Sequence, residues 1–140
     1  MQLLKNACIF IILLLPTSLL SAANPPVELK PGMIITSSLQ VKRAIYQING
    51  YDSLNRPVIF IKGDNITVDF NNALLQGSID KQLPNSFYGL AILIRGNNIT
   101  LKNAKISGYK VAVMAEGCKN LTIENADFSY NYRQQLQSTW

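Results

Sequence analysis

The chain of 140 residues carries 13 lysines and arginines against 8 aspartates and glutamates, a formal net charge of +5, and it contains no histidine. A chain without histidine cannot supply a Ser/His/Asp triad, a Cys/His pair or a histidine-liganded metal. The basic residues are scattered rather than clustered, so nucleic acid is not an expected partner.

Residues 1–23 have the organisation of a secretory signal peptide. Lys5 precedes an apolar run over residues 7–15, and Ser21 and Ala23 place small side chains before a cleavage point after Ala23. The run is too short to span a bilayer, although an N-terminal membrane anchor is the alternative. We therefore expect a secreted protein with no stable membrane span after cleavage.

Cleavage leaves residues 24–140, enough for one small domain, and lowers the net charge from +5 to +4 by removing Lys5. Cys118 is then the single cysteine, so no internal disulfide can form. A mildly basic secreted surface suits an acidic polysaccharide as partner, although the same charge also serves solubility.

The N-terminal half of this domain predicts extended structure. Residues 24–32 are proline-rich and predict an extended lead-in that cannot form a helix. Residues 33–48 predict two short strands, one at Ile34 and Thr36 and one from Leu39 to Ile45, with an amphipathic helix over residues 38–47 as the alternative. A turn at 49–53 then precedes a strand at 58–61.

A repeated segment dominates the rest of the chain. The sequence NITLKNA at residues 98–104 recurs as NLTIENA at 120–126, and a shorter copy, NITVD at 65–69, precedes both. The spacing of roughly 22 residues between the two longer copies indicates a solenoid. Alternating inward apolar and outward threonine side chains have the period of a strand. The spacing after the shorter copy is larger, and we assign the surplus mainly to a long loop over residues 78–89.

Stacking of the repeats predicts columns of equivalent residues about 4.8 Å apart. We expect opposite charges to be neighbours, which assigns these carboxylates to structure rather than catalysis. We also expect two columns of asparagines at turns with left-handed backbone. The charged neighbours are Asp69, Lys102 and Glu124, then Lys105 with Asp127 and Arg95 with Glu116; the asparagines are Asn65, Asn98 and Asn120, and Asn72, Asn103 and Asn125.

The sequences GNNITLKNA at 96–104 and GCKNLTIENA at 117–126 resemble the repeat of right-handed parallel β-helix proteins of the pectate-lyase-like superfamily. Residues 128–134 also resemble a segment of secreted bacterial β-helix proteins. The resemblance covers residues 33–131. It implies an all-β fold, a right-handed parallel β-helix of about four coils of roughly 22 residues over 33–140, with an uncapped C-terminal end. It also implies a bacterial protein of the periplasm, cell surface or medium.

This superfamily contains polysaccharide lyases, glycoside hydrolases, epimerases and phage spike proteins, so the fold alone does not define the reaction. We expect the N-terminal coils of a polysaccharide lyase or glycosidase, with most of the active site beyond residue 140; a non-catalytic surface binding or structural module is the alternative. No catalytic residue can be assigned, because carboxylate pairs such as Asp64 with Asp69 suit structural roles. β-helix lyases often use Ca²⁺, but no cluster of acids supplies a calcium site, and no cofactor is expected.

Two places are candidates for binding a polysaccharide. In the loop over residues 80–88, Phe87 or Tyr88 offers a ring for stacking on a sugar; the alternative is a tolerated surface insertion with one aromatic tucked against the coil.

The second place is the segment with Tyr130, Tyr132 and Arg133, together with Tyr109 about one coil earlier. Arginine suits the carboxylate of an anionic sugar, and tyrosine suits stacking or proton transfer. The alternative is a corner in which tyrosine covers the apolar stack.

Overall fold

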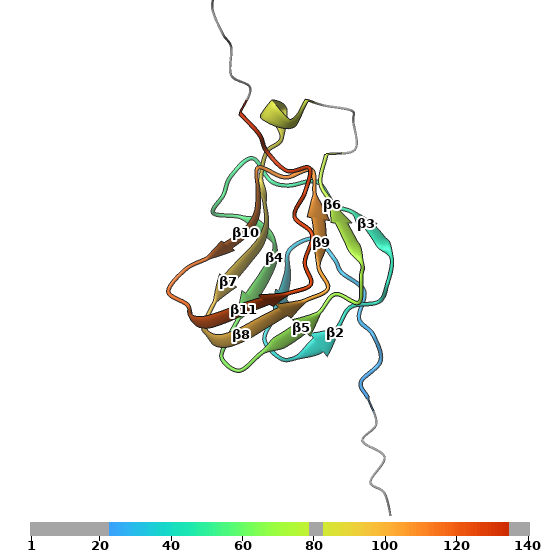
Figure 1. The fold of residues 1–140 in the computed structure, drawn as a ribbon, viewed down its shortest axis with the longest axis vertical. Coiled ribbons are helices and arrows are strands. Elements are labelled where there is room, and N and C mark those ends of the chain that lie inside the picture. Colours follow the sequence, from blue (N-terminus) through green and yellow to red (C-terminus); the bar gives the residue numbers. More distant parts are fainter. Residues whose placement is uncertain (1–22, 79–82, 135–140) are drawn as a thin grey trace, which may run out of the picture.

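The computed structural model describes residues 23–78 and 83–134, and these are built almost wholly from strands (Figure 1). The strands are β1 (Met33–Ile35), β2 (Leu39–Gln40), β3 (Ile45–Gln47), β4 (Pro57–Lys62), β5 (Thr67–Asp69), β6 (Leu74–Gln76), β7 (Leu90–Arg95), β8 (Asn97–Lys102), β9 (Lys105–Ser107), β10 (Val111–Ala115) and β11 (Lys119–Glu124). One short 3-10 helix, η1 (Pro84–Ser86), lies in the loop between β6 and β7.

The region over residues 33–48 forms strands, and the alternative helix over 38–47 is wrong. Leu39 and Val41 face the core while Gln40 between them is exposed, so burial alternates with the period of a strand. The predicted second strand is not continuous. It divides into β2 and β3, because the chain turns from one sheet to the next at residues 42–44.

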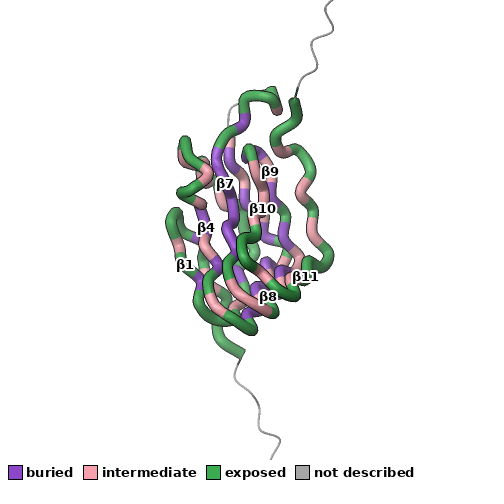
Figure 2. Tube along the Cα trace, turned by 90° about the vertical axis from the view of Figure 1, so that its left-hand side faces the viewer, coloured by how far each residue is buried: buried purple, intermediate pink, exposed green. Residues whose placement is uncertain are grey.

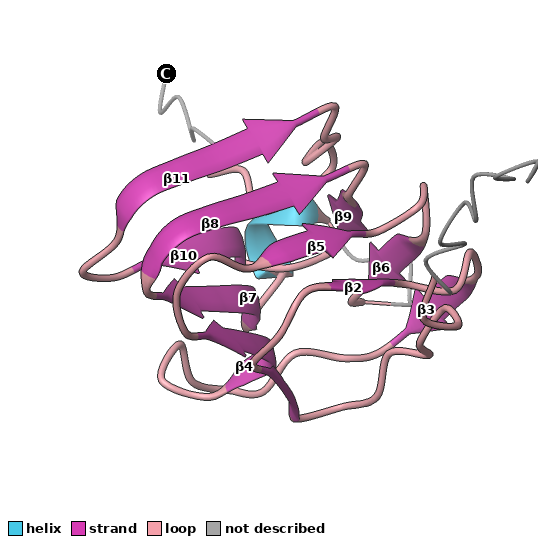
Figure 3. Cartoon of the chain, turned by 90° about the horizontal axis from the view of Figure 1, so that it is seen from below, coloured by secondary structure: helices cyan, strands magenta, loops and turns pink. Residues whose placement is uncertain are grey.

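The strands form three sheets in which every pairing is parallel. The sheet orders are β1-β4-β7-β10, β2-β5-β8-β11 and β3-β6-β9. The chain therefore contributes one strand to each sheet in turn and then begins again at the first sheet. We call each such round a passage, and each passage stacks on the one before it (Figure 3). This is the all-β, all-parallel, solenoid-like arrangement that the repeat predicts.

Apolar side chains form the core between the three sheets. Figure 2 marks the buried positions along the chain in purple. Ile66, Val68, Ile99 and Leu101 are at most 2% exposed, which confirms their predicted inward orientation. Each such side chain contributes about 1.5–3 kcal/mol to stability through burial. The same pattern predicts Ile123 inside, but Ile123 is 43% exposed, because β11 is the edge strand of its sheet and no described strand covers it.

The predicted charge columns are confirmed by the strand register. Lys102 Nζ lies 3.3 Å from Glu124 Oε2, and Arg95 Nε donates to Glu116 Oε2 over 2.8 Å. Because these pairs are exposed, each is worth only about 0–1 kcal/mol. The stacked neighbours are Asp69 with Lys102, Lys102 with Glu124, Arg95 with Glu116, and Lys105 with Asp127.

The first asparagine column is a continuous side-chain ladder. Asn98 Nδ2 donates to Asn65 Oδ1 over 3.0 Å, and Asn120 Nδ2 donates to Asn98 Oδ1 over 2.9 Å. All three residues have left-handed backbone, with φ between 55° and 57°. The turn between the first and second sheets thus has the same geometry on the three passages that carry these asparagines.

The second column departs from the prediction at its first member. Asn125 donates to Asn103, but the Asn103 amide donates to Asp69 Oδ1 over 2.8 Å rather than to Asn72. The backbones of Asn72 and Asn103 still lie next to each other in the stack, since the Asn72 N–H donates to the Asn103 carbonyl. Two extra residues, including the buried Phe70, widen this turn and move the Asn72 side chain out of the column.

The lead-in runs along the first passage of the stack, where Val27 pairs in parallel with Val41 and Leu29 is buried. The signal-peptide prediction concerns residues that, apart from Ala23, lie outside the described part of the chain, as do residues 79–82 of the predicted loop and 135–140. Among the residues described, no helix has the length and apolar character needed to cross a membrane.

Candidate functional site

Four segments lie side by side along one corner of the stack, which we call the loop corner: residues 48–56, 83–89, 108–110 and 130–133 (Figure 1). The first three connect the sheet of β3, β6 and β9 to the sheet of β4, β7 and β10. Backbone hydrogen bonds join the segments, from Lys110 N–H to the Tyr88 carbonyl and from Tyr132 N–H to the Tyr109 carbonyl. The loop corner is therefore an ordered surface built on the stack.

Glycine lets these loops approach closely. A Cβ atom added to Gly89 would lie 2.7 Å from the Cα of Gly50, closer than real Cβ atoms come, and Gly89 has a φ of 80°. The two loops thus touch backbone to backbone. This contact fixes the relative position of the side chains on either side of it.

Two of the predicted site residues form the floor of the loop corner. Tyr109 is fully buried, and its hydroxyl donates to the Ile48 carbonyl over 2.5 Å. Burial raises the pKa of the Tyr109 hydroxyl far above its usual range, so it stays protonated. Phe87 is 3% exposed and packs edge-on against Tyr130, with ring centroids 5.5 Å apart. Both rings take part in packing.

The other four predicted residues are exposed, and the structure brings two of them to either side of a lysine. Lys110 Nζ lies 5.9 Å above the Tyr132 ring centre, and the backbone N–H of Lys110 donates to the Tyr88 carbonyl. Arg133 is exposed, and its backbone N–H donates to the Pro84 carbonyl. Tyr88 and Tyr132 are 39% and 42% exposed, so both rings can contact a ligand.

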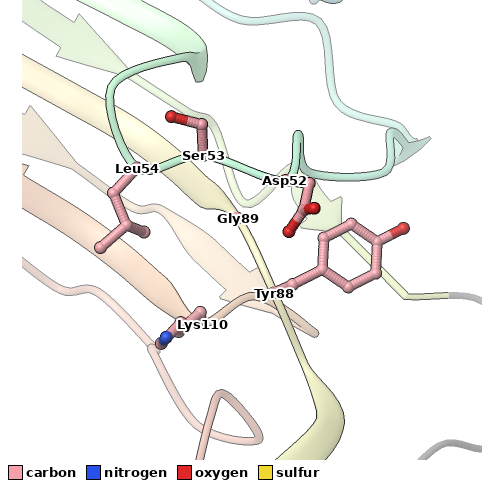
Figure 4. Close-up of a pocket in the computed structure, with 6 residues that line it drawn as sticks. All are labelled: Asp52, Ser53, Leu54, Tyr88, Gly89 and Lys110. Carbon is pink, nitrogen blue, oxygen red and sulfur yellow. The ribbon is translucent and has the colours of Figure 1, made fainter.

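A pocket of about 250 Å³ opens between the first loop and these residues (Figure 4). Its polar groups come from different passages of the chain: the Asp52 carboxylate and Ser53 hydroxyl from the loop after β3, and Lys110 from the turn after β9. The residues that line the pocket are Asp52, Ser53, Leu54, Tyr88, Gly89 and Lys110.

A second cation, Arg56, lies on the same loop as Asp52. The Arg56 guanidinium stacks over the Tyr51 ring, with 3.9 Å between the guanidinium carbon and the ring centre. Such a contact orients arginine while leaving its N–H groups available to an anion. Asp52, Arg56 and Lys110 are not among the residues that the sequence predicted for the site.

The sequence held a signal for Lys110. Because Leu90 pairs with Val111, Lys110 is the stacked equivalent of Gly89 and follows directly on Tyr109, the equivalent of Tyr88. Extending the alignment of the repeats toward the loop corner would have placed this lysine beside Tyr88. Asp52 and Arg56 lie outside the repeat, and no comparable pattern points to them.

Asp64 and Asp69 accept hydrogen bonds at turns of the stack. Asp64 Oδ1 accepts the N–H of Asn97 over 2.6 Å, and Asp69 Oδ1 accepts from Asn71 and Asn103. In the part of the chain that the structure describes, no three carboxylate, thiol or imidazole groups gather to hold a metal ion. The pocket therefore offers one carboxylate with one amine, a set suited to binding a polar ligand.

Comparison of the chain with known protein families, with curated proteins and with solved structures finds no match.

Proposed function

We propose that this protein is a secreted bacterial β-helix, right-handed and of about four coils, whose loop corner binds an acidic polysaccharide. The three parallel sheets and the asparagine ladder support the β-helix of the pectate-lyase-like type. The N-terminal sequence, with its short apolar run and Ala23 cleavage point, supports secretion.

The observation that carries the binding proposal is that Tyr88 and Lys110 line one pocket, while the Lys110 Nζ also lies 5.9 Å from the centre of the Tyr132 ring. A sugar ring has an apolar C–H face, which packs on an aromatic ring, and an edge of hydroxyl groups, which need polar partners. Asp52 and Ser53 supply those partners. The Lys110 amine supplies the counter-charge for a uronate carboxylate.

The charge of the loop corner supports an acidic rather than a neutral ligand. Its described segments carry Arg56, Lys110 and Arg133 against the single carboxylate of Asp52. Positive charge concentrated beside a pocket raises the local concentration of a polyanion and speeds its association. The attraction weakens as salt is added, because screening shortens its range to about 10 Å at 0.1 M ionic strength.

Catalysis by a polysaccharide lyase is the second candidate, and one observation favours it. Tyr88, Lys110 and Asp52 line the same pocket, and a lyase needs a base beside a group that neutralises the uronate carboxylate. Incubation with polygalacturonate distinguishes the two candidates, because a lyase generates unsaturated products that absorb ultraviolet light and a binding module does not.

Calorimetric titration with oligogalacturonates tests the proposal. We expect Lys110→Gln to weaken binding about tenfold, since a charge-assisted hydrogen bond is worth about 1.5–3 kcal/mol. Lys62→Gln is the matched control, because Lys62 is also an exposed lysine but lies at the end of β4, away from the loop corner. Equal affinity of the two variants, or equal binding of a neutral oligosaccharide by the native protein, would overturn the proposal.

A further inference from the structure

A second hollow of about 330 Å³ lies on the outer face of the sheet of β3, β6 and β9. Its floor comes from β6 and β9, and its rim comes from the segment over residues 127–130, where Asp127 continues this sheet by pairing with Lys105. We call it the outer groove. The residues that line it are Leu74, Lys105, Ile106, Ser107, Asp127, Ser129 and Tyr130.

Tyr130 at the rim of the outer groove has an unusual backbone. Its φ is 58°, in the left-handed region where the other non-glycine residues of the described chain are all asparagines. A bulky residue in this conformation is strained and persists only where its surroundings impose it. The Tyr130 side chain is nevertheless 63% exposed, so burial of the ring does not offset the strain.

The surroundings that impose this conformation are hydrogen bonds of the next residue. Asn131 Oδ1 accepts from the N–H of Tyr109, and Asn131 Nδ2 donates to the carbonyls of Ile106 and Phe128, both over 2.8 Å. The Tyr130 carbonyl accepts from the N–H of Gly108. The Tyr130 ring rests edge-on against the buried Phe87. An exposed ring is thus held in a defined position.

The side chains of the outer groove suit a sugar, and their charges sum to zero. Tyr130 and Leu74 are apolar surfaces, Ser107 and Ser129 carry hydroxyls, and the Lys105 amine is balanced by the neighbouring Asp127 carboxylate. The chain connects this groove to the loop corner, since Tyr130 and Tyr132 are two residues apart, at most about 7 Å along an extended chain.

We infer that the outer groove is a second sugar subsite continuous with the loop corner, and that Tyr130 is its aromatic platform. This inference rests on the proposed function. The ligand is accordingly a segment of polysaccharide several sugars long: the loop corner holds a uronate residue, and the outer groove holds a neighbouring residue without needing its carboxylate.

Affinity as a function of chain length tests this inference. With di-, tetra- and hexagalacturonate, we expect affinity to rise about tenfold with length in the native protein, a gain typical of one additional packed sugar. Tyr130→Ala should abolish that gain, while Tyr130→Phe should retain it. Ile34→Ala, which truncates an exposed apolar side chain on another sheet, is the control.

A second variant makes the test independent of the strained turn. Ser107→Asp places a negative charge on the outer face of β9 and should lower hexasaccharide affinity without altering the Tyr130 backbone. If Tyr130→Ala and Ser107→Asp both keep the native dependence on length, the second subsite is refuted. In that case, a tenfold lower affinity of Lys110→Gln at every oligosaccharide length would still support binding at the loop corner. Unchanged affinity of Lys110→Gln would refute the proposed function itself.

Discussion

Asn98 stands in the middle of a ladder in which each side-chain amide donates to the asparagine stacked before it. Two properties suit asparagine to this position. Its short polar side chain makes left-handed backbone accessible at low cost, and its amide offers one donor group and one acceptor on opposite sides. Because an asparagine recurs at this turn on three successive passages, the side-chain hydrogen bonds run along the stack. The same residue type therefore adopts the left-handed turn and bonds to the asparagines stacked on either side.

We predict that Asn98→Ala lowers the free energy of unfolding by about 2 kcal/mol, and that Asn98→Gly lowers it by about 1 kcal/mol. Both variants lose the two ladder bonds, but only alanine is strained at a φ of 55°. Denaturant unfolding measures both values. Equal losses would show that the left-handed backbone contributes nothing.

Asp69 closes the second asparagine column and makes the stability depend on pH. Burial raises the pKa of the Asp69 carboxyl, but hydrogen bonds from Asn103 and from the Asn71 N–H outweigh burial and hold the pKa below its usual value. A carboxyl with a lowered pKa in the folded state stabilises above its unfolded-state pKa. That contribution is lost as pH falls through the folded-state pKa.

We therefore predict that native stability falls on acidification from about pH 5 toward pH 2, and that Asp69→Asn shows a shallower fall. Asparagine retains an oxygen for the Asn103 amide but does not titrate. The measurement is the free energy of unfolding of both proteins over this range. A difference between them that stays constant with pH would contradict the assignment.

Tyr109 illustrates a residue whose type suggests a ligand contact but whose position is structural. We predict that Tyr109→Phe lowers the free energy of unfolding by about 1–3 kcal/mol, because the half-buried Ile48 carbonyl loses its donor. Tyr88→Phe is the matched control, since Tyr88 is 39% exposed, and it should change stability by less than about 0.5 kcal/mol. Similar losses in both variants would contradict the buried hydrogen bond.

Stacking decides whether a glycine position of the repeat can accept a side chain. Gly96 and Gly117 occupy equivalent positions after β7 and β10. A Cβ atom on Gly96 would overlap the carbonyl oxygen of Gly63, whereas one on Gly117 meets nothing within 4 Å. The two turns differ because the one at Gly117 holds an extra residue, Cys118, and takes a φ of 61° where Gly96 has 142°.

We predict that Gly96→Ala destabilises the protein by more than about 4 kcal/mol or prevents folding. Gly117→Ala should cost about 1 kcal/mol, for the strain of a φ of 61° alone. Thermal and denaturant unfolding of the two variants give the comparison. If Gly96→Ala folds with the stability of Gly117→Ala, the close backbone contact between passages is not present.

The elements were predictable where the repeat is regular. The copies at 65–69, 98–104 and 120–126 fixed β5, β8 and β11 and their register, because equivalent residues in a parallel stack pair directly. Burial at the end of the stack was not predictable, since Ile123 follows the same pattern as Leu101 yet lacks a covering strand. Periodicity shows which way a side chain points but not what lies beyond it.

The regular stack supports a surface where irregular segments meet. The three sheets carry the apolar core, and their connections bring residues far apart in the chain, such as Asp52 and Lys110, to one pocket. Sequence reasoning identified Tyr88, Tyr132 and Arg133 by residue type. It could not separate these exposed residues from the buried Phe87 and Tyr109, because loop packing follows no period.

Binding of an acidic polysaccharide at the loop corner can be followed residue by residue in a nitrogen-15 NMR titration with hexagalacturonate. We predict that backbone amide shifts change at residues 48–56, 83–89, 108–110 and 130–133, and diminish with added salt. Amides of the asparagine ladder around Asn98 should not move. Amide shifts that remain unchanged at a large excess of hexagalacturonate, or that change at β10 and β11 alone, would contradict binding at the loop corner.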